Sequence, residues 1–155
     1  MFRKCLFFML LFIGIVHFSL GEEIDTKDFY ITPRIGVSTL TGLIGIELQY
    51  KHFAFDIGYI RGTPPDEDVN HDLTYGIRYY FEPHRSTAYI GLGGWIDLVK
   101  IIDEDEGRTT IGFIVGYRWR WGKGWDFCLG IGPAFSKGRG AFAPPLFDIA
   151  IGYSF

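Results

Sequence analysis

Residues 146–155 read Leu-Phe-Asp-Ile-Ala-Ile-Gly-Tyr-Ser-Phe. Large apolar side chains occupy every second position from Phe147 to Phe155, and small or polar side chains such as Asp148 and Gly152 lie between them. A period of two residues is typical of a β-strand with one apolar face and one small or polar face. The stretch therefore predicts a strand, and its alternation can be sought along the rest of the chain.

The same alternation recurs seven times upstream of this stretch. Pro33 and Pro133 fall inside two of these segments, and we expect a bulge or a strand end near each because proline cannot donate to a ladder. The composition agrees with an all-β chain, since 18% of the residues are aromatic and 21 are glycine. The expected strands are residues 28–38, 43–50, 53–61, 73–81, 87–99, 109–121, 125–136 and 146–155.

The two faces of these expected strands differ in kind. One face is bulky and apolar without interruption, whereas the other carries glycines and ionisable residues. Eight strands enclose an interior only just wide enough for side chains, which suits the small and charged face. The apolar face then turns outward, as it does in barrels that span a membrane. We therefore expect an all-β fold, an eight-stranded antiparallel up-and-down transmembrane β-barrel.

The connections between the expected strands alternate in length. Residues 51–52, 82–86 and 122–124 make tight turns, whereas residues 62–72, 100–108 and 137–145 make long loops. Outer-membrane barrels have short periplasmic turns and longer extracellular loops. The alternation predicts that both termini and the tight turns are periplasmic. Residues 39–42 are the one expected outer connection that is short.

The beginning of the chain has the pattern of a secretory signal peptide. Arg3 and Lys4 precede a mostly apolar run over residues 5–18, and Ser19 and Gly21 are small. The run is shorter than the ~20 apolar residues that a membrane-spanning helix needs. We expect residues 1–21 to be a signal peptide and residues 22–155 to form the outer-membrane β-barrel.

Cleavage after residue 21 would change the charge and the cysteine content. The remaining chain has 13 basic and 18 acidic residues, a net charge of −5, so no basic surface for nucleic acid is expected. Cys128 would be the sole cysteine, which leaves no intramolecular disulfide. Because Cys128 lies on the small and charged face, we interpret it as a small filler of the interior.

Nine ionisable residues fall on the inward face. Their signs are nearly balanced, and an unpaired buried charge is costly, so we expect pairs across the lumen. Glycines on the same face are expected to leave space for these long side chains. The interpretation is a salt-bridged plug, with a narrow polar pore or gate as the alternative. The residues of this expected lumen charge network are Arg34, Glu47, Asp56, Arg78, Asp97, Arg118, Arg120, Asp126 and Asp148.

The outer loops carry charges that suggest possible ligands. The acidic runs at residues 66–68 and 103–106 could supply oxygen ligands to Ca²⁺ or Mg²⁺, but charge runs usually only stay solvated. Basic residues at positions 108, 137 and 139 could meet lipopolysaccharide phosphates. We expect no cofactor and no bound metal.

Over residues 28–155 the chain resembles the small outer-membrane β-barrels of the OmpA/OmpW-like group. The resemblance rests on strand count, alternation, loop asymmetry and the terminal Ile-Gly-Tyr-Ser-Phe. It implies residence in a bacterial outer membrane, contact with membrane lipids and lipopolysaccharide, and reading of the last strand by the barrel assembly machinery. A monomer is expected.

The resemblance leaves three functional hypotheses. The first is a non-enzymatic envelope protein, structural or surface-interacting, with a mostly plugged lumen. The second is a small channel for ions or an apolar solute. The third is a lipid A-modifying enzyme, which needs an activated nucleophile or base, and the candidates are His71 with Asp72, and Ser38 or Ser136. Palmitoyl-transferring barrels carry an Asp-Ser pair in their outer loops, but Leu73 follows Asp72 here. We therefore expect no enzyme.

Overall fold

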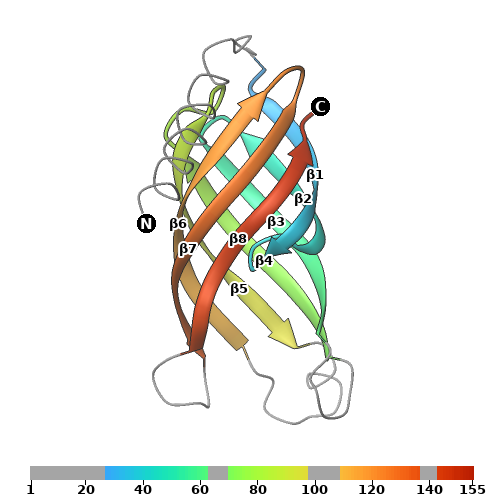
Figure 1. Ribbon diagram of the computed structural model, residues 1–155, viewed down its shortest axis with the longest axis vertical. Helices are drawn as coiled ribbons and strands as arrows, with labels where there is room; N and C mark the ends of the chain where they lie inside the picture. Colours follow the sequence, from blue (N-terminus) through green and yellow to red (C-terminus); the bar gives the residue numbers. More distant parts are fainter. Residues whose placement is uncertain (1–26, 63–69, 98–108, 137–142) are drawn as a thin grey trace, which may run out of the picture.

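The computed structural model describes residues 27–62, 70–97, 109–136 and 143–155. These residues form one antiparallel sheet that closes on itself, with the strands in sequence order around the barrel (Figure 1). The predicted eight-stranded antiparallel architecture is confirmed. No helix within the described ranges is long and apolar enough to cross a membrane. The strands are β1 (Phe29–Ser38), β2 (Gly42–Tyr50), β3 (Phe53–Gly62), β4 (Asn70–Tyr80), β5 (Thr87–Asp97), β6 (Thr109–Trp121), β7 (Trp125–Ser136) and β8 (Ala143–Tyr153).

Several sequence predictions lie outside the described residues. They are the signal peptide, the acidic runs at residues 66–68 and 103–106, and the basic residues at positions 108, 137 and 139. The two ends of the barrel differ in the strands that begin or finish there. The terminal end is where β1 begins and β8 ends, and the loop end is where β3, β5 and β7 finish.

The strand pairing is strongly staggered around the barrel. A row of paired residues starts at Phe29, crosses β2 to β7, and reaches Phe147 on β8. The carbonyl of Phe147 accepts the N–H of Thr39 on the far side of β1. Following the pairing once around the barrel therefore leads from Phe29 to Thr39, a shift of ten residues along the chain. Such a stagger requires tilted strands, and Figure 1 shows the tilt.

The alternation of side chains around the sheet places bulky apolar groups on the outer surface. Ile35 is 65% exposed and Phe113 is 50% exposed, although both are large apolar residues. Arg34 and Arg78, by contrast, are almost completely buried inside the barrel. The core of this protein is therefore polar and charged over much of its length, and its outer surface is apolar.

The predicted strand ends differ most from the observed ones at β8. We expected β8 to begin at residue 146, but it begins at Ala143 and contains Pro144 and Pro145. Its ladder with β1 stops at Asp148, and its ladder with β7 is irregular opposite Pro133. The two prolines therefore remove no regular ladder bond, which explains why they are tolerated in a strand.

Pro33 and Pro133, the two prolines expected to disturb their strands, behave differently from each other. The register of β7 with β8 shifts between Gly132 and Ala134, so the expected bulge is present at Pro133. Pro33, however, pairs with Ile46 in regular register. The ladder between β1 and β8 begins only at Arg34, so Pro33 lies just outside that ladder, a position where proline is tolerated.

The hairpin of β1 and β2 is shorter than its neighbours. Figure 1 shows it ending partway along the barrel, while β3 and β8 continue past it. We expected residues 39–42 to be an outer connection, yet Leu40 and Thr41 are buried. The β1–β2 turn, residues 39–41, therefore folds into the lumen instead of projecting from the barrel.

Candidate functional site

The lumen is the candidate functional site, and Arg78 on β4 lies at its centre. The Nε of Arg78 is 2.7 Å from Oδ2 of Asp56, and its Nη1 is 2.7 Å from Oδ2 of Asp148. Glu47 adds a longer contact of 3.6 Å to the same Nε. All four side chains are fully buried. One planar guanidinium on β4 thus joins β2, β3 and β8, because its nitrogens point in fixed, separate directions.

Arg34 on β1 forms a second node beside the first. Its Nη1 is 2.6 Å from Oδ1 of Asp126 and its Nη2 is 3.0 Å from Oε1 of Glu47. Glu47 is shared by both arginines, and its Oε2 also accepts the hydroxyl of Tyr80 at 2.7 Å. The centre of the lumen is therefore one connected network of charge-assisted hydrogen bonds and not a set of separate pairs.

Arg118 and Arg120 lie toward the terminal end and have partners of another kind. We expected both to pair with carboxylates, but the ion pairs among the described residues include neither of them. Arg118 donates to Oε1 of Gln49 and to the carbonyl of Pro83, both at 2.7 Å. Arg120 donates to the same carbonyl at 3.2 Å and to Oγ of Ser154 at 3.2 Å. These neutral acceptors correct the expectation.

The β4–β5 turn, residues 81–86, supplies the acceptor for these two arginines. Pro83 is buried, and its carbonyl receives both guanidinium groups and the amide of Gln49. The guanidinium groups also lie over aromatic rings, with Arg118 3.7 Å from the centroid of Tyr80 and Arg120 4.5 Å from that of Tyr30. Cation–π contacts and a strong carbonyl acceptor together explain how two buried cations are accommodated without direct carboxylates.

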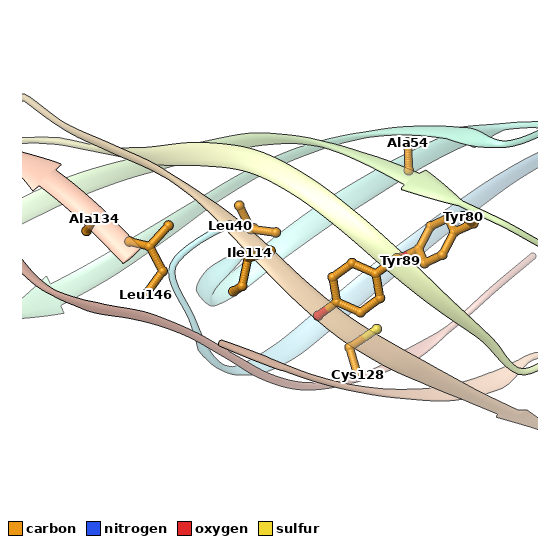
Figure 2. Packing of buried hydrophobic residues seen from close by; sticks show 8 residues of the cluster. All are labelled: Leu40, Ala54, Tyr80, Tyr89, Ile114, Cys128, Ala134 and Leu146. Carbon is orange, nitrogen blue, oxygen red and sulfur yellow. The ribbon is translucent and has the colours of Figure 1, made fainter. Parts of the chain in front are cut away.

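The loop end of the lumen contains an apolar cluster. Leu40 is fully buried and packs in a cluster with Ile114, Leu146 and Ala134, against which Trp95 also packs. Figure 2 shows Leu40 beside Ile114, between Leu146 on one side and Tyr89 on the other. The backbone of the turn is held by its own hairpin, because Oγ of Ser38 accepts the N–H groups of Leu40 and Thr41 at 3.1 Å.

Glycines on β3 and β5 make room for this turn. A Cβ on Gly93 would lie 2.6 Å from Cδ2 of Leu40, and a Cβ on Gly58 would lie 1.8 Å from the carbonyl oxygen of Thr41. Gly42 leaves the turn with φ +71°, a conformation that favours glycine. Our expectation that inward glycines leave space for charged side chains is therefore incomplete, because these glycines accommodate an inward turn.

Two tyrosines complete the network and were not identified as site residues from the sequence. Tyr80 donates to Glu47, and Tyr89 donates to Oδ2 of Asp148. Gly116 and Gly130 leave room for the ring of Tyr89, since a Cβ on either would lie within 2.5 Å of its hydroxyl. The alternation along each strand could have identified both tyrosines as inward, because each lies between two outward residues.

The remaining residues named from the sequence are placed as follows. Asp97 is the last residue of β5 and its backbone pairs with Asp72, but its side chain lies outside the described residues. Asp126 also accepts the hydroxyl of Ser154 at 3.2 Å. Cys128 is buried, and its Sγ accepts a hydrogen bond from Nη1 of Arg34 at 3.2 Å.

The residues considered for catalysis lie on opposite faces of the sheet. Ser38 is buried inside the barrel, where its hydroxyl holds the β1–β2 turn. His71 instead hydrogen-bonds and stacks with Tyr59, which is exposed on the outer surface. Ser136 ends β7 and pairs with Thr110. His71 and Ser38 are therefore not brought together as a nucleophile and its base.

Comparisons with protein-family models, with curated proteins and with solved structures found no match to this chain. In the described residues four arginines face four carboxylates, which are Glu47, Asp56, Asp126 and Asp148. This arrangement neutralises charge inside the barrel and joins opposite walls.

Proposed function

We propose that this protein is an integral β-barrel of a bacterial outer membrane, of the small OmpA/OmpW-like kind, with both termini on the periplasmic side. Its lumen is closed, and its role in the envelope is structural or surface-interacting and not catalytic. The observation that carries the proposal is the inverted distribution of side chains. Apolar groups cover the outside of a barrel whose inside is charged.

The extent of the apolar surface supports residence in lipid. Among the described residues, 29 large apolar side chains are exposed, and they come from all eight strands or their edges. A monomeric soluble protein seldom exposes a contiguous apolar patch larger than a few hundred Å². Water is therefore a poor solvent for this surface, whereas the acyl chains of a bilayer are a good one.

Aromatic clusters at the terminal end support the orientation. Tyr79 contacts Phe53 and Phe81 with ring centroids 5.3 and 5.5 Å apart. On another part of the same rim, Tyr153 contacts Trp125 at 5.2 Å and Phe155 at 5.0 Å. Rings of this kind favour the boundary between lipid and water, and the terminal end carries the tight turns typical of the periplasmic side.

The closed lumen supports a non-conducting role. Arg34, Arg78 and Arg118 extend into the interior and are fully buried, so charged side chains occupy its cross-section. Reconstitution into planar bilayers tests this directly, and we expect no conductance steps. Regular steps would favour the channel hypothesis, and a change in lipid A measured by mass spectrometry on expression would favour the enzyme.

A pair of substitutions tests membrane insertion. Phe113 and Tyr50 are similarly exposed, at 50% and 56%, but Phe113 lies near the middle of β6 and Tyr50 at the terminal end of β2. In lipid, Phe113→Arg should cost about 2 to 4 kcal/mol of unfolding free energy, and Tyr50→Arg only about 0 to 1 kcal/mol. Urea unfolding in lipid vesicles measures both.

The same pair shows how the proposal would fail. In a water-soluble barrel an exposed arginine is nearly neutral at either position. Equal, small effects for Phe113→Arg and Tyr50→Arg would therefore contradict insertion. A wild-type protein that folds as a soluble monomer without detergent would contradict it as well.

A further inference from the structure

We propose that the β1–β2 turn, residues 39–41, is a displaceable stopper that closes the loop end of the lumen. Its withdrawal opens the charged centre of the barrel to the solution on that side. The proposal rests on the closed lumen of the proposed function, and adds which element closes it and how it opens.

The turn occupies the lumen because its hairpin stops short. β3 and β8 continue past the hairpin toward the loop end (Figure 1), and the turn bends into the barrel beside them. Leu40 and Thr41 are 0% and 1% exposed, so the tip of the turn is buried, whereas Thr39 is only partly buried. Thr39 ties the turn to β8, because its N–H and hydroxyl donate to the carbonyl of Phe147 at 2.8 and 2.9 Å.

A socket in the wall formed by β2 to β5 matches the turn. Five glycines on four consecutive strands, from β2 to β5, lie at inward positions that Leu40 or the carbonyl of Thr41 approaches. An added Cβ would come within 3.3 Å of the turn at every one of them, so any other residue would fill the socket. These positions are Gly45, Gly58, Gly76, Gly91 and Gly93.

The turn is held by packing and not by charge. Residues 39–41 carry no ionisable side chain, and the bonds of Leu40 and Thr41 to Ser38 Oγ stay within the hairpin, so they can move with it. Within the described residues the Thr41 hydroxyl is buried without a hydrogen-bond partner, which disfavours the inserted state. Withdrawal therefore breaks apolar contacts and the bonds of Thr39, but no ion pair.

Removal of Leu40 would uncover the middle of the lumen. In Figure 2, Tyr89 and Cys128 lie on the side of Leu40 away from Leu146, toward the terminal end. Tyr89 bonds to Asp148 and Cys128 contacts Arg34, so both belong to the charged centre. Cys128 is therefore a native probe, since its thiol can react with a water-soluble reagent only when that reagent enters the lumen.

The experiment measures the labelling rate of Cys128 in the reconstituted full chain. A Cys5→Ser background leaves Cys128 as the sole thiol. Gly58→Ala places a Cβ 1.8 Å from the Thr41 carbonyl oxygen and forces the turn outward. Leu40→Ser removes the apolar anchor. Both variants should label with a water-soluble maleimide at least about tenfold faster than the background protein, because access limits the reaction.

Two control variants distinguish a stopper from a generally loosened barrel. Gly94→Ala creates the same 1.8 Å clash with a backbone carbonyl, that of Thr110, but away from the turn. Leu40→Met keeps the apolar volume of the anchor. Both should label as slowly as the background protein. Equal acceleration in Gly94→Ala would overturn the proposal, as would slow labelling in folded Gly58→Ala and Leu40→Ser.

Folding of each variant is measured separately from labelling. Retention of the folded barrel band on unheated gels identifies variants that fold, and Leu40→Ala replaces Leu40→Ser should the latter not fold. Fast labelling of the background protein itself would contradict the closed lumen of the proposed function. Slow labelling of the background protein together with slow labelling of the folded variants would contradict the stopper alone.

Discussion

The two ends of the lumen are closed by inward turns that use different physical interactions. At the loop end, the β1–β2 turn places Leu40 in a glycine-lined socket, so shape and apolar contact hold it. At the terminal end, the β4–β5 turn offers the Pro83 carbonyl to Arg118 and Arg120, so charge-assisted hydrogen bonds hold it. Opening the loop end would therefore cost packing, whereas opening the terminal end would leave buried cations unsatisfied.

The location of each interaction follows from what lies beside it. Arg118 and Arg120 both lie on β6, and neither forms an ion pair with a carboxylate among the described residues. A buried guanidinium group nevertheless needs a strong hydrogen-bond acceptor. A turn that brings a carbonyl inward supplies one. At the loop end the neighbouring inward residues, such as Ile114 and Leu146, are apolar, so a leucine is the matching contact.

The largest expected loss of unfolding free energy comes from a substitution in the centre of the lumen, between the two ends. Arg78→Met removes the cation shared by Asp56 and Asp148 and leaves two buried carboxylates without it. The unfolding free energy should fall by about 3 to 5 kcal/mol, as when one partner of a buried pair is removed. Urea unfolding in lipid vesicles measures it. A loss below that of Leu40→Ala would show that packing, and not the charge network, dominates the lumen.

The apolar end should give the next largest effect. Leu40→Ala removes a fully buried side chain and should cost about 2 to 5 kcal/mol, toward the lower value where the turn can relax into the cavity. Leu92→Ala is the matched control, because Leu92 is 53% exposed on the outer surface of β5. Equal losses for the two leucines, measured by the same unfolding assay, would mean that the socket contributes no specific packing.

The cationic end should give the smallest effect of the three. Arg118→Met deprives Gln49 Oε1 of a donor, but Pro83 keeps its bond from Arg120. We expect a loss of about 1 to 3 kcal/mol, the cost of unsatisfied buried polar groups. Arg118→Lys should lose less, since it retains a donor. Should Arg118→Met accelerate labelling of Cys128 as strongly as Leu40→Ser does, the two ends would be equally able to open.

The alternation along the chain was sufficient to predict much of the fold. The bounds of β6 and β7 were predicted correctly, and the parity of each strand identified Phe113 as outward and Arg78 as inward. This succeeds because the pleat of a strand sends successive side chains to opposite faces, whatever the rest of the molecule does. Fold class and facing are therefore properties of local sequence.

The partners inside the lumen were decided only by the tertiary structure. Arg78 meets Asp148 across the barrel, and Leu40 reaches Gly93, because the sheet closes with a stagger of ten residues between Phe29 and Thr39. No local pattern encodes that stagger, which depends on the sum of seven strand registers and the closing one. For the same reason the inward β1–β2 turn was not predicted: whether a turn points in or out depends on how far the neighbouring strands extend.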